Sequence, residues 1–496
     1  MDQYQTPSLW RTAENCPIIH PEAAKDCILP DAYPDIHRIL YTYATINPGR
    51  TAWTADKLRT DGSIYATVLF ADDEGAMHTV RFSIDYSGQM PYEMSGEEYT
   101  VIADTVLDSV SARAQNPRRL SIRGRFTVTP RVLVRCGDEP QMPPELSQLS
   151  LEKKLQTRTC WRVGQWMEHG IEASEDLALG ADAAIAEILW SDLALEITSA
   201  EMSEAAVRFH GNGILHLLYQ ATGGGVQYTA LTFPIRSSVN GEFPADAICR
   251  VMLMPGQISV MPVEDATGEA RSVELDFSYT VQTIAAWRSE CTRAVDCYSI
   301  DQPTVTRTET VRVLSGVKEL AMETERTVEG ERGELRSILH TALQLGIDSR
   351  EIAEEGMIWH CTAQITLLGK DEEGMPLSVS LTEQFPISVP YAETMFERIR
   401  LAAQPEVSME DGQVKVSLPL RLEGMAADAQ SISYVGSILP TSGDLPSSED
   451  SITLCYPQAG ETAWDIAKRY RISQGMLASV NSLPEEGLPT VLLIPR

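Results

Sequence analysis

The sequence predicts a mainly β protein, with three β-rich, sandwich-like repeats followed by a small β-α-α-β domain. Three observations carry this prediction: the chain resembles itself at an offset of 149 residues, segments of alternating apolar and polar residues recur, and helix-capping residues gather near its end. Alternation indicates half-buried strands, because successive side chains of a strand point to opposite faces of a sheet. The clearest alternating segments are residues 120–134, 272–284 and 412–422.

The repeats are visible as apolar residues that keep one register over a long stretch. At an offset of 149, Leu40 falls on Leu189, and 29 residues later Leu69 still falls on Leu218. Leu339 lies 150 residues beyond Leu189 and marks a third copy. Chance similarity rarely holds its register for so long, so we expect three copies of one structural unit.

A run of three glycines at 223–225 invites comparison with phosphate-binding loops, which are also rich in glycine. In the repeat alignment this run occupies the place of residues 72–75 and 371–374, two acidic segments between expected strands. A phosphate loop requires a strand on one side and a helix on the other. We therefore expect a β-hairpin turn at all three positions.

The composition indicates a soluble protein. The 496 residues include 43% hydrophobic and 22% charged side chains, and no apolar run is long enough to span a bilayer, so we expect no transmembrane segment. Forty basic residues against seventy acidic ones leave a formal charge of −30. This charge repels phosphate backbones and argues against nucleic-acid binding.

The N-terminus and the cysteines predict the compartment. The first 19 residues lack a basic segment followed by an apolar core, so we expect no secretory signal. The nine cysteines, an odd number scattered along the chain, do not form the dense pattern of a disulfide scaffold. We therefore expect free thiols in a reducing cytoplasm.

A search for catalytic and metal-binding patterns finds none that is specific. The chain contains no Walker loop, HExxH, GxSxG or dinucleotide fingerprint, and Cys291 and Cys297 do not form a CxxC pair. His216 lies in an expected strand where the other copies carry Thr67 and Ile365, so we expect a packed histidine there. The prediction is a protein that is not an enzyme, without catalytic residues, metal site or cofactor.

The last 45 residues, 452–496, are expected to form a strand, two helices and a second strand. Thr462 is a helix N-cap, and Asp465 three residues later completes a capping box. Ser473 can cap the second helix and Asn481 can end it. Four acidic and four basic residues balance in this segment, so the whole excess of acid lies upstream.

Residues 456–495 resemble a LysM domain, through a Gly-acid-Thr-x-Trp core and an Asn-x-Leu turn. In LysM domains that bind peptidoglycan or chitin, two loops form a shallow groove for N-acetylglucosamine. The resemblance implies a partner- or glycan-binding site at Gly460, Glu461, Thr462, Ala463, Trp464, Asn481, Ser482, Leu483 and Pro484. Ala459, Glu461 and Ala463 depart from the common LysM residues. The alternative interpretation of Trp464 is core packing.

The first repeat resembles the SPOCS domain of spore-coat proteins over residues 25–135. The similarity rests on a Leu-Pro-x-x-x-Pro-Asp-Ile segment from Leu29 to Ile36 and on an Asn-Pro-Arg segment from Asn116 to Arg118. The second and third repeats keep the strand pattern without the Asn-Pro-Arg segment, so their assignment as SPOCS-type depends on the internal alignment.

SPOCS repeats followed by a LysM domain resemble the spore-coat morphogenetic family of the clostridial SipL type and, more distantly, the SpoVID type of bacilli. The resemblance implies a non-enzymatic scaffold in the mother-cell cytoplasm, recruited during sporulation to the forespore surface and the spore coat. Its implied partners are the SpoIVA-type coat ATPase of the basement layer and other coat proteins, with the LysM domain as the docking module. The alternative is a LysM domain that binds N-acetylglucosamine in peptidoglycan and anchors the protein to the spore cortex or cell wall.

Composition and alignment divide the chain into seven segments. They are an N-terminal segment (1–24), the first SPOCS-type repeat (25–136), a connector (137–176), the second repeat (177–328), the third repeat (329–435), a linker (436–451) and the LysM domain (452–496). The connector carries Trp161, Trp166 and Met167, which either cover a seam between repeats or belong to the core of the second. The linker is rich in Ser, Pro and Gly and predicts a tail that moves relative to the body.

Overall fold

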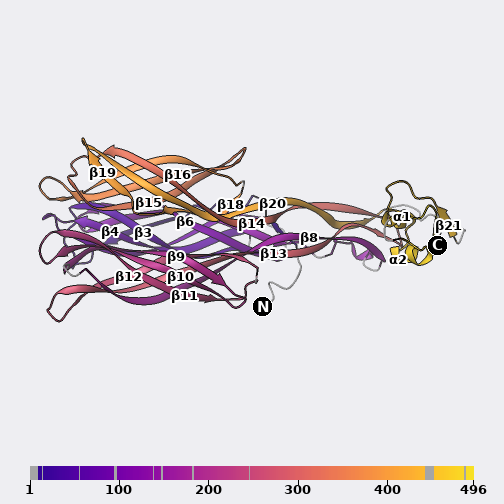
Figure 1. Cartoon of the computed structure of the whole chain (residues 1–496), viewed down its shortest axis with the longest axis horizontal. Coiled ribbons are helices and arrows are strands. Elements are labelled where there is room, and N and C mark those ends of the chain that lie inside the picture. Colours follow the sequence, from indigo (N-terminus) through magenta and orange to yellow (C-terminus); the bar gives the residue numbers. More distant parts are fainter. Residues whose placement is uncertain are drawn as a thin grey trace.

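The computed structural model describes residues 9–495, except for 14, 55, 94–97, 138, 147–148, 181–183, 245, 392, 442–451 and 485–486. Strands account for 74% of the described residues and helices for 4%, which confirms the prediction of a mainly β protein. In Figure 1 most strands gather in an elongated body. A narrow bundle of strands leads from this body to a small helical unit at the C-terminal end.

The first unit of the body, residues 10–135, consists of two antiparallel sheets. In one sheet β1, β2 and β6 all pair with β7, and the other sheet has the order β3-β4-β5. The strands are β1 (Trp10–Thr12), β2 (Glu22–Ile28), β3 (Arg38–Thr54), β4 (Lys57–Ala71), β5 (Met77–Pro91), β6 (Tyr99–Asn116) and β7 (Arg119–Arg135).

The second unit, residues 151–299, has a related plan. A meander β9-β10-β11 accompanies a sheet in which the long strands β8 and β12 both pair with β13. The turn between β10 and β11 contains the glycine run at 223–225, which confirms the predicted hairpin. The strands are β8 (Leu151–Ala178), β9 (Ile185–Met202), β10 (Ala206–Ala221), β11 (Val226–Asn240), β12 (Ile248–Glu264) and β13 (Ala270–Ser299).

The third unit, residues 304–440, repeats this arrangement with one strand divided in two. The meander is β15-β16-β17, and β14, β18 and β19 all pair with β20. The strands are β14 (Thr304–Glu331), β15 (Ser337–Ala353), β16 (Gly356–Lys370), β17 (Pro376–Val389), β18 (Thr394–Leu401), β19 (Glu406–Glu410) and β20 (Gln413–Pro440).

Each unit has its own apolar core, and the three units also share two clusters. One of these shared clusters contains Leu40, Leu189 and Leu339, the residues that the internal alignment superposes. Beside them the ring of Trp190 lies 4.8 Å from the ring of His340, measured between centroids. Because equivalent side chains meet at one place, the three units surround a common centre.

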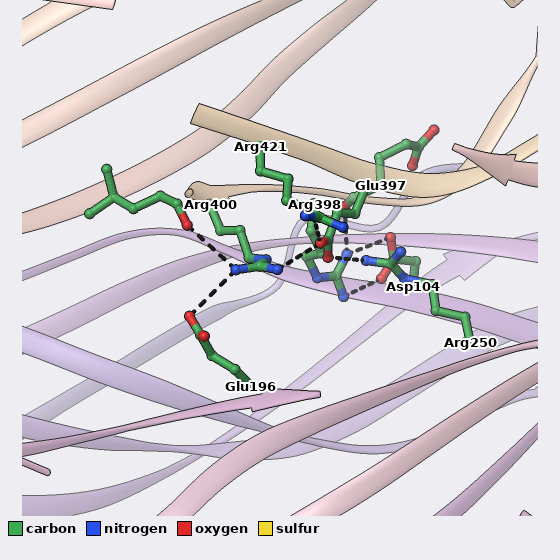
Figure 2. A network of polar contacts seen from close by, with 9 residues as sticks. Asp104, Glu196, Arg250, Glu397, Arg398, Arg400 and Arg421 are labelled. Carbon is green, nitrogen blue, oxygen red and sulfur yellow. Dashed lines mark hydrogen bonds and ion pairs between the residues drawn. The ribbon is translucent and has the colours of Figure 1, made fainter. Parts of the chain in front are cut away.

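A second contact between the units is ionic (Figure 2). Arg398 of the third unit donates to both carboxylate oxygens of Asp104 of the first unit, at 2.6 and 2.9 Å. Glu423 of the third unit accepts from Arg250 of the second unit at 3.0 Å and from Arg400 at 2.8 Å. Asp104 is only 5% exposed, and a buried carboxylate requires such partners to offset its lost hydration. The network therefore joins all three units.

Four strand ends leave the body together and form a narrow extension, which we call the stalk: residues 151–160, 289–299, 304–314 and 429–440 (Figure 1). They belong to β8, β13, β14 and β20, strands of 28 to 30 residues. A strand of this length spans about 90 Å, enough to cross the body and continue beyond it. Inside the stalk, Cys297, Val435 and Ile438 pack against Leu146 of the short 3-10 helix η1 (Pro144–Leu146).

The connector expected at 137–176 is strand over most of its length, because β8 covers it from Leu151 onward. Trp166 packs against the core of the second unit. Trp161 instead joins a cluster shared between units, and Met167 lines a cleft between the first and second units. Both alternatives for this segment therefore apply, each to different side chains.

Two further boundaries differ from those expected. β14 begins the third unit and pairs with β20 from end to end, although most of it was expected in the second repeat at 177–328. Residues 436–440 of the expected linker complete β20, whereas 442–451 lie outside the described residues. Alternation indicates a strand but does not reveal which unit the strand pairs with, and this explains both differences.

Candidate functional site

The C-terminal module, residues 452–495, has the strand-helix-helix-strand order expected from the sequence. β21 (Ile452–Cys455) pairs antiparallel with β22 (Leu492–Pro495), and the helices α1 (Ala463–Tyr470) and α2 (Gln474–Val480) lie between them in the chain. The buried core of the module consists of Cys455, Trp464, Ile466, Ala467, Ile472, Leu477, Leu492 and Ile494.

Both helices begin at the predicted capping residues. Thr462 Oγ1 accepts from the Asp465 amide at 3.3 Å, and Asp465 accepts in return from the Thr462 amide at 2.9 Å, which confirms the capping box. Ser473 Oγ accepts from the Met476 amide at 3.0 Å at the start of α2. Thr462, a predicted site residue, therefore has a structural role.

Asn481 ties α2 to β22. Its side-chain nitrogen donates to the carbonyls of Leu477 and Leu493 at 2.9 and 2.7 Å, and its side-chain oxygen accepts from the Leu493 amide at 2.8 Å. Both amide hydrogens are thus engaged within the module. Of its neighbours, Ser482 and Pro484 are exposed, whereas Leu483 packs against the core.

The loop before α1 is also held by contacts within the module. Gly460 has a φ of +86°, a left-handed conformation that glycine adopts without steric cost. Glu461 forms an ion pair with Arg469 and accepts from the Gln458 amide at 2.7 Å. Ala463 packs partly against the core. These groups shape the loop, and the Glu461 carboxylate is already satisfied.

Trp464 points toward the tip of the stalk and is only 4% exposed. Its indole nitrogen donates to Asp296 Oδ2 at 2.8 Å. Its ring meets the ring of Tyr298 edge-on, with centroids 5.1 Å apart. Aromatic pairs favour this T-shaped geometry. The central residue of the expected groove therefore contacts another part of the same chain.

Two further polar contacts hold the module on the stalk. Lys468 Nζ lies 2.6 and 2.8 Å from the two carboxylate oxygens of Asp296. The hydroxyl of Tyr298 donates to the carbonyl of Ile472 at 2.7 Å. Asp296 and Tyr298 are thus the anchor residues of this junction. Sequence reasoning could not select them, because they lie 168 and 174 residues from their partners and belong to a strand without a recognisable motif.

The two segments that carry the SPOCS resemblance meet in the first unit. Arg118 donates to the carbonyls of Tyr33 at 2.6 Å and Pro30 at 3.0 Å. The Ile36 amide donates to the carbonyl of Pro117 at 2.8 Å. Arg118 therefore holds the loop from Leu29 to Ile36 in place through main-chain carbonyls.

His216 and the cysteines other than Cys455 of the module are packed in the body. His216 Nδ1 lies 2.6 Å from the Tyr228 hydroxyl, and burial lowers the pKa of His216. All nine cysteines are free thiols, and the sulfurs of Cys160 and Cys291 lie 3.4 Å apart. These groups contribute to packing between strands and between units.

In the residues that the structure describes, no three His, Cys, Asp or Glu side chains are grouped so that they could hold a metal ion. Neither of the helices found in this part of the chain has the length and apolar character needed to cross a membrane. The chain matches no protein-family model, and searches of curated proteins and of solved structures gave no match either.

Proposed function

We propose that this protein is a non-enzymatic morphogenetic scaffold of the spore coat, in which three SPOCS-type repeats form the body and a LysM domain forms the docking module. It acts in the mother-cell cytoplasm and tethers the coat basement layer, with its SpoIVA-type ATPase, to the forespore surface. The observation that carries the proposal is the burial of Trp464 against Tyr298 and Asp296. The loop expected to receive a sugar is engaged in a contact between protein surfaces.

The outer surface of the module also supports a protein partner. Leu454 and Leu493 are opposite each other on the two-stranded sheet, and they are 55% and 38% exposed. Exposed apolar side chains that gather in a small region are typical of protein-binding surfaces. The exposed large apolar residues of the described part of the module are Leu454, Tyr456, Met476, Val480, Val491 and Leu493.

The binding test uses the full chain and its Tyr298→Ala variant, which weakens the stalk junction and frees the Trp464 loop. Calorimetry measures binding to the SpoIVA-type ATPase of the same organism and, separately, to N-acetylglucosamine oligomers. We expect the ATPase to bind both proteins and the oligomers to bind neither. Sugar binding by Tyr298→Ala without ATPase binding would establish the peptidoglycan-anchoring alternative.

A matched variant tests the outer surface. Tyr456 is 66% exposed, so Tyr456→Ala is expected to leave the module folded. If this surface meets the ATPase, the variant weakens binding by about tenfold or more, as expected for an aromatic residue at the centre of an interface. ATPase binding unchanged in Tyr456→Ala would place the contact elsewhere on the module.

A further inference from the structure

A cleft of about 710 Å³ lies in the body, between the first and second units. One wall is a face of the β3-β4-β5 sheet, and the other comes from β8, β9, β12 and β13. The opposite face of the β3-β4-β5 sheet packs in the core of the first unit, so the cleft face is not needed for that core. Its side chains form two cross-strand rows: Tyr43, Thr67 and Arg81, and Thr45, Tyr65 and Ser83.

The charges of the cleft are unbalanced. Among its described lining residues are three carboxylates, Glu172, Asp192 and Asp276, and one cation, Arg81. Glu172 and Asp276 are exposed, whereas Asp192 is half-buried. The lining therefore attracts cations, and the acidic body around it adds to that attraction.

Arg81 does not neutralise Asp192 by direct pairing. Its guanidinium donates to Ser191 Oγ at 2.6 Å and to the Ser191 carbonyl at 3.3 Å. In the described part of the chain, no cationic side chain lies within 4.0 Å of the Asp192 carboxylate, whose charged form is favoured by the adjacent Leu193 amide. A half-buried carboxylate with unused acceptor capacity is a suitable partner for a cationic ligand.

The Asp192 carboxylate is peculiar to this junction. The counterparts of Asp192 in the other units are Tyr43 and Ala342, which occupy the same place in the strand pairing. A charge required only for packing around the common centre would be expected to recur. In the strand pairing, His216 lies opposite Asp192, and Thr366 lies opposite Ala342. The counterpart of His216 in the third unit is therefore Thr366, and the expected alignment with Ile365 is wrong by one residue.

The second-unit wall is shaped by a β-bulge. The pairing of β12 with β13 shifts between Pro255 and Ile258, and the Gln257 amide donates to Ser278 Oγ at 3.0 Å instead of to the ladder. Bulges redirect the backbone and occur often beside binding sites. Across the cleft, Tyr43 and Tyr65 provide hydroxyl acceptors and aromatic rings.

We propose that this cleft binds a primary alkylammonium group, with Asp192 as its counter-ion and with Tyr43 and Tyr65 beside it. An ammonium group has three donors, which suit a carboxylate and phenol oxygens, and its charge is attracted to aromatic rings. The same chemistry is found in a free diamine and in the lysine side chain of a protein partner. This inference is independent of the docking role of the C-terminal module.

The test is calorimetric titration of the full chain with 1,5-diaminopentane, with Nα-acetyl-lysine amide and with neutral 1,5-pentanediol. We expect saturable binding of an amine and none of the diol. Stronger binding of the lysine derivative identifies a protein side chain as the source, and stronger binding of the diamine identifies a free amine. Lack of amine binding at about 1 mM, the weak end of specific affinity, would overturn the proposal, as would equal binding of the diol.

Two charge-neutralising variants locate the binding. Asp192→Asn is expected to weaken amine binding by about tenfold or more, because it removes a charge-assisted hydrogen bond. Asp85→Asn removes a charge from β5 outside the cleft lining and is expected to leave the affinity unchanged. Equal affinities in these two variants would refute the site. Should Asp192→Asn fail to fold, Glu172→Gln at the exposed rim provides the same test with an expected two- to threefold loss, about 0.5 kcal/mol.

Discussion

The body and the C-terminal module are joined to the rest of the molecule in different ways. The three units of the body share an apolar cluster and an ionic network that includes Asp104 and Arg398. The module is held at the tip of the stalk by contacts that converge on Asp296 and Tyr298. The three units of the body therefore form one continuous structure. The module contacts the stalk through a small junction, and an external partner can compete with the stalk for that surface of the module.

The largest effect is expected for Asp104→Ala in the body. The substitution leaves Arg398 at the unit junction without its bidentate partner. Breaking a buried ion pair on one side costs several kcal/mol, and because the Arg398 side chain is 26% exposed we expect a loss of about 3 kcal/mol. Urea denaturation followed by circular dichroism measures the change in unfolding free energy.

The control for this variant is Arg336→Ala, which breaks an exposed ion pair with Glu372. Exposed pairs contribute about 0–1 kcal/mol, so this variant should unfold almost like the parent protein. If the two variants lose the same free energy, the network at the unit junction is no more important than a surface pair, and the contrast between body and module disappears.

An intermediate effect concerns pH. Burial raises the pKa of Asp192 to about 6, against the partial influence of Arg81 and with Tyr41, Tyr43 and Tyr228 nearby. The folded protein therefore keeps this proton at pH values where the unfolded chain has lost it. The corresponding stability is complete below pH 4 and is lost as pH rises from about 4 to about 6.

Asp192→Asn removes this pH dependence. We expect the parent protein to lose about 2 kcal/mol relative to the variant across that interval, since one pKa unit corresponds to about 1.4 kcal/mol and Asp192 is partly solvated. Urea unfolding at several pH values measures the difference. Parallel pH profiles for the two proteins would contradict the assignment.

In the module the pH dependence of stability has the opposite sign. Hydrogen bonds with Thr462 lower the pKa of Asp465, so the contribution of this carboxylate to stability is lost as pH falls.

The same comparison explains what could be predicted from the sequence. The helix starts at Thr462 and Ser473 were predictable because a cap and its partner lie within three residues of each other. The shared position of Leu40, Leu189 and Leu339 was predictable from their nearly equal spacing along the sequence. The caps depend on residues close in sequence, and the leucines recur at a regular spacing, so both features can be recognised in the sequence.

Other features depend on contacts between distant segments. Asp104 and Arg398 are 294 residues apart, and neither lies in a motif. The full extent of β8 was missed because its two faces meet different surroundings. Trp166 faces the core of one unit and Trp161 a cluster between units, so simple alternation is lost. Such pairings require the folded arrangement.

The smallest effect is expected for Thr462→Ala in the module. The substitution removes the side-chain oxygen that caps α1 and breaks the reciprocal bond with Asp465. Loss of an N-cap costs about 1 kcal/mol, so hydrogen exchange of the α1 amides should accelerate about fivefold. Ser482→Ala changes an exposed residue of the neighbouring loop and should leave these rates unchanged. Hydrogen exchange in the body should be the same in both variants, because the few contacts at Asp296 couple the unfolding of the module only weakly to that of the three units. Acceleration that extends into β13 would show that module and body unfold together, and would remove the distinction between them.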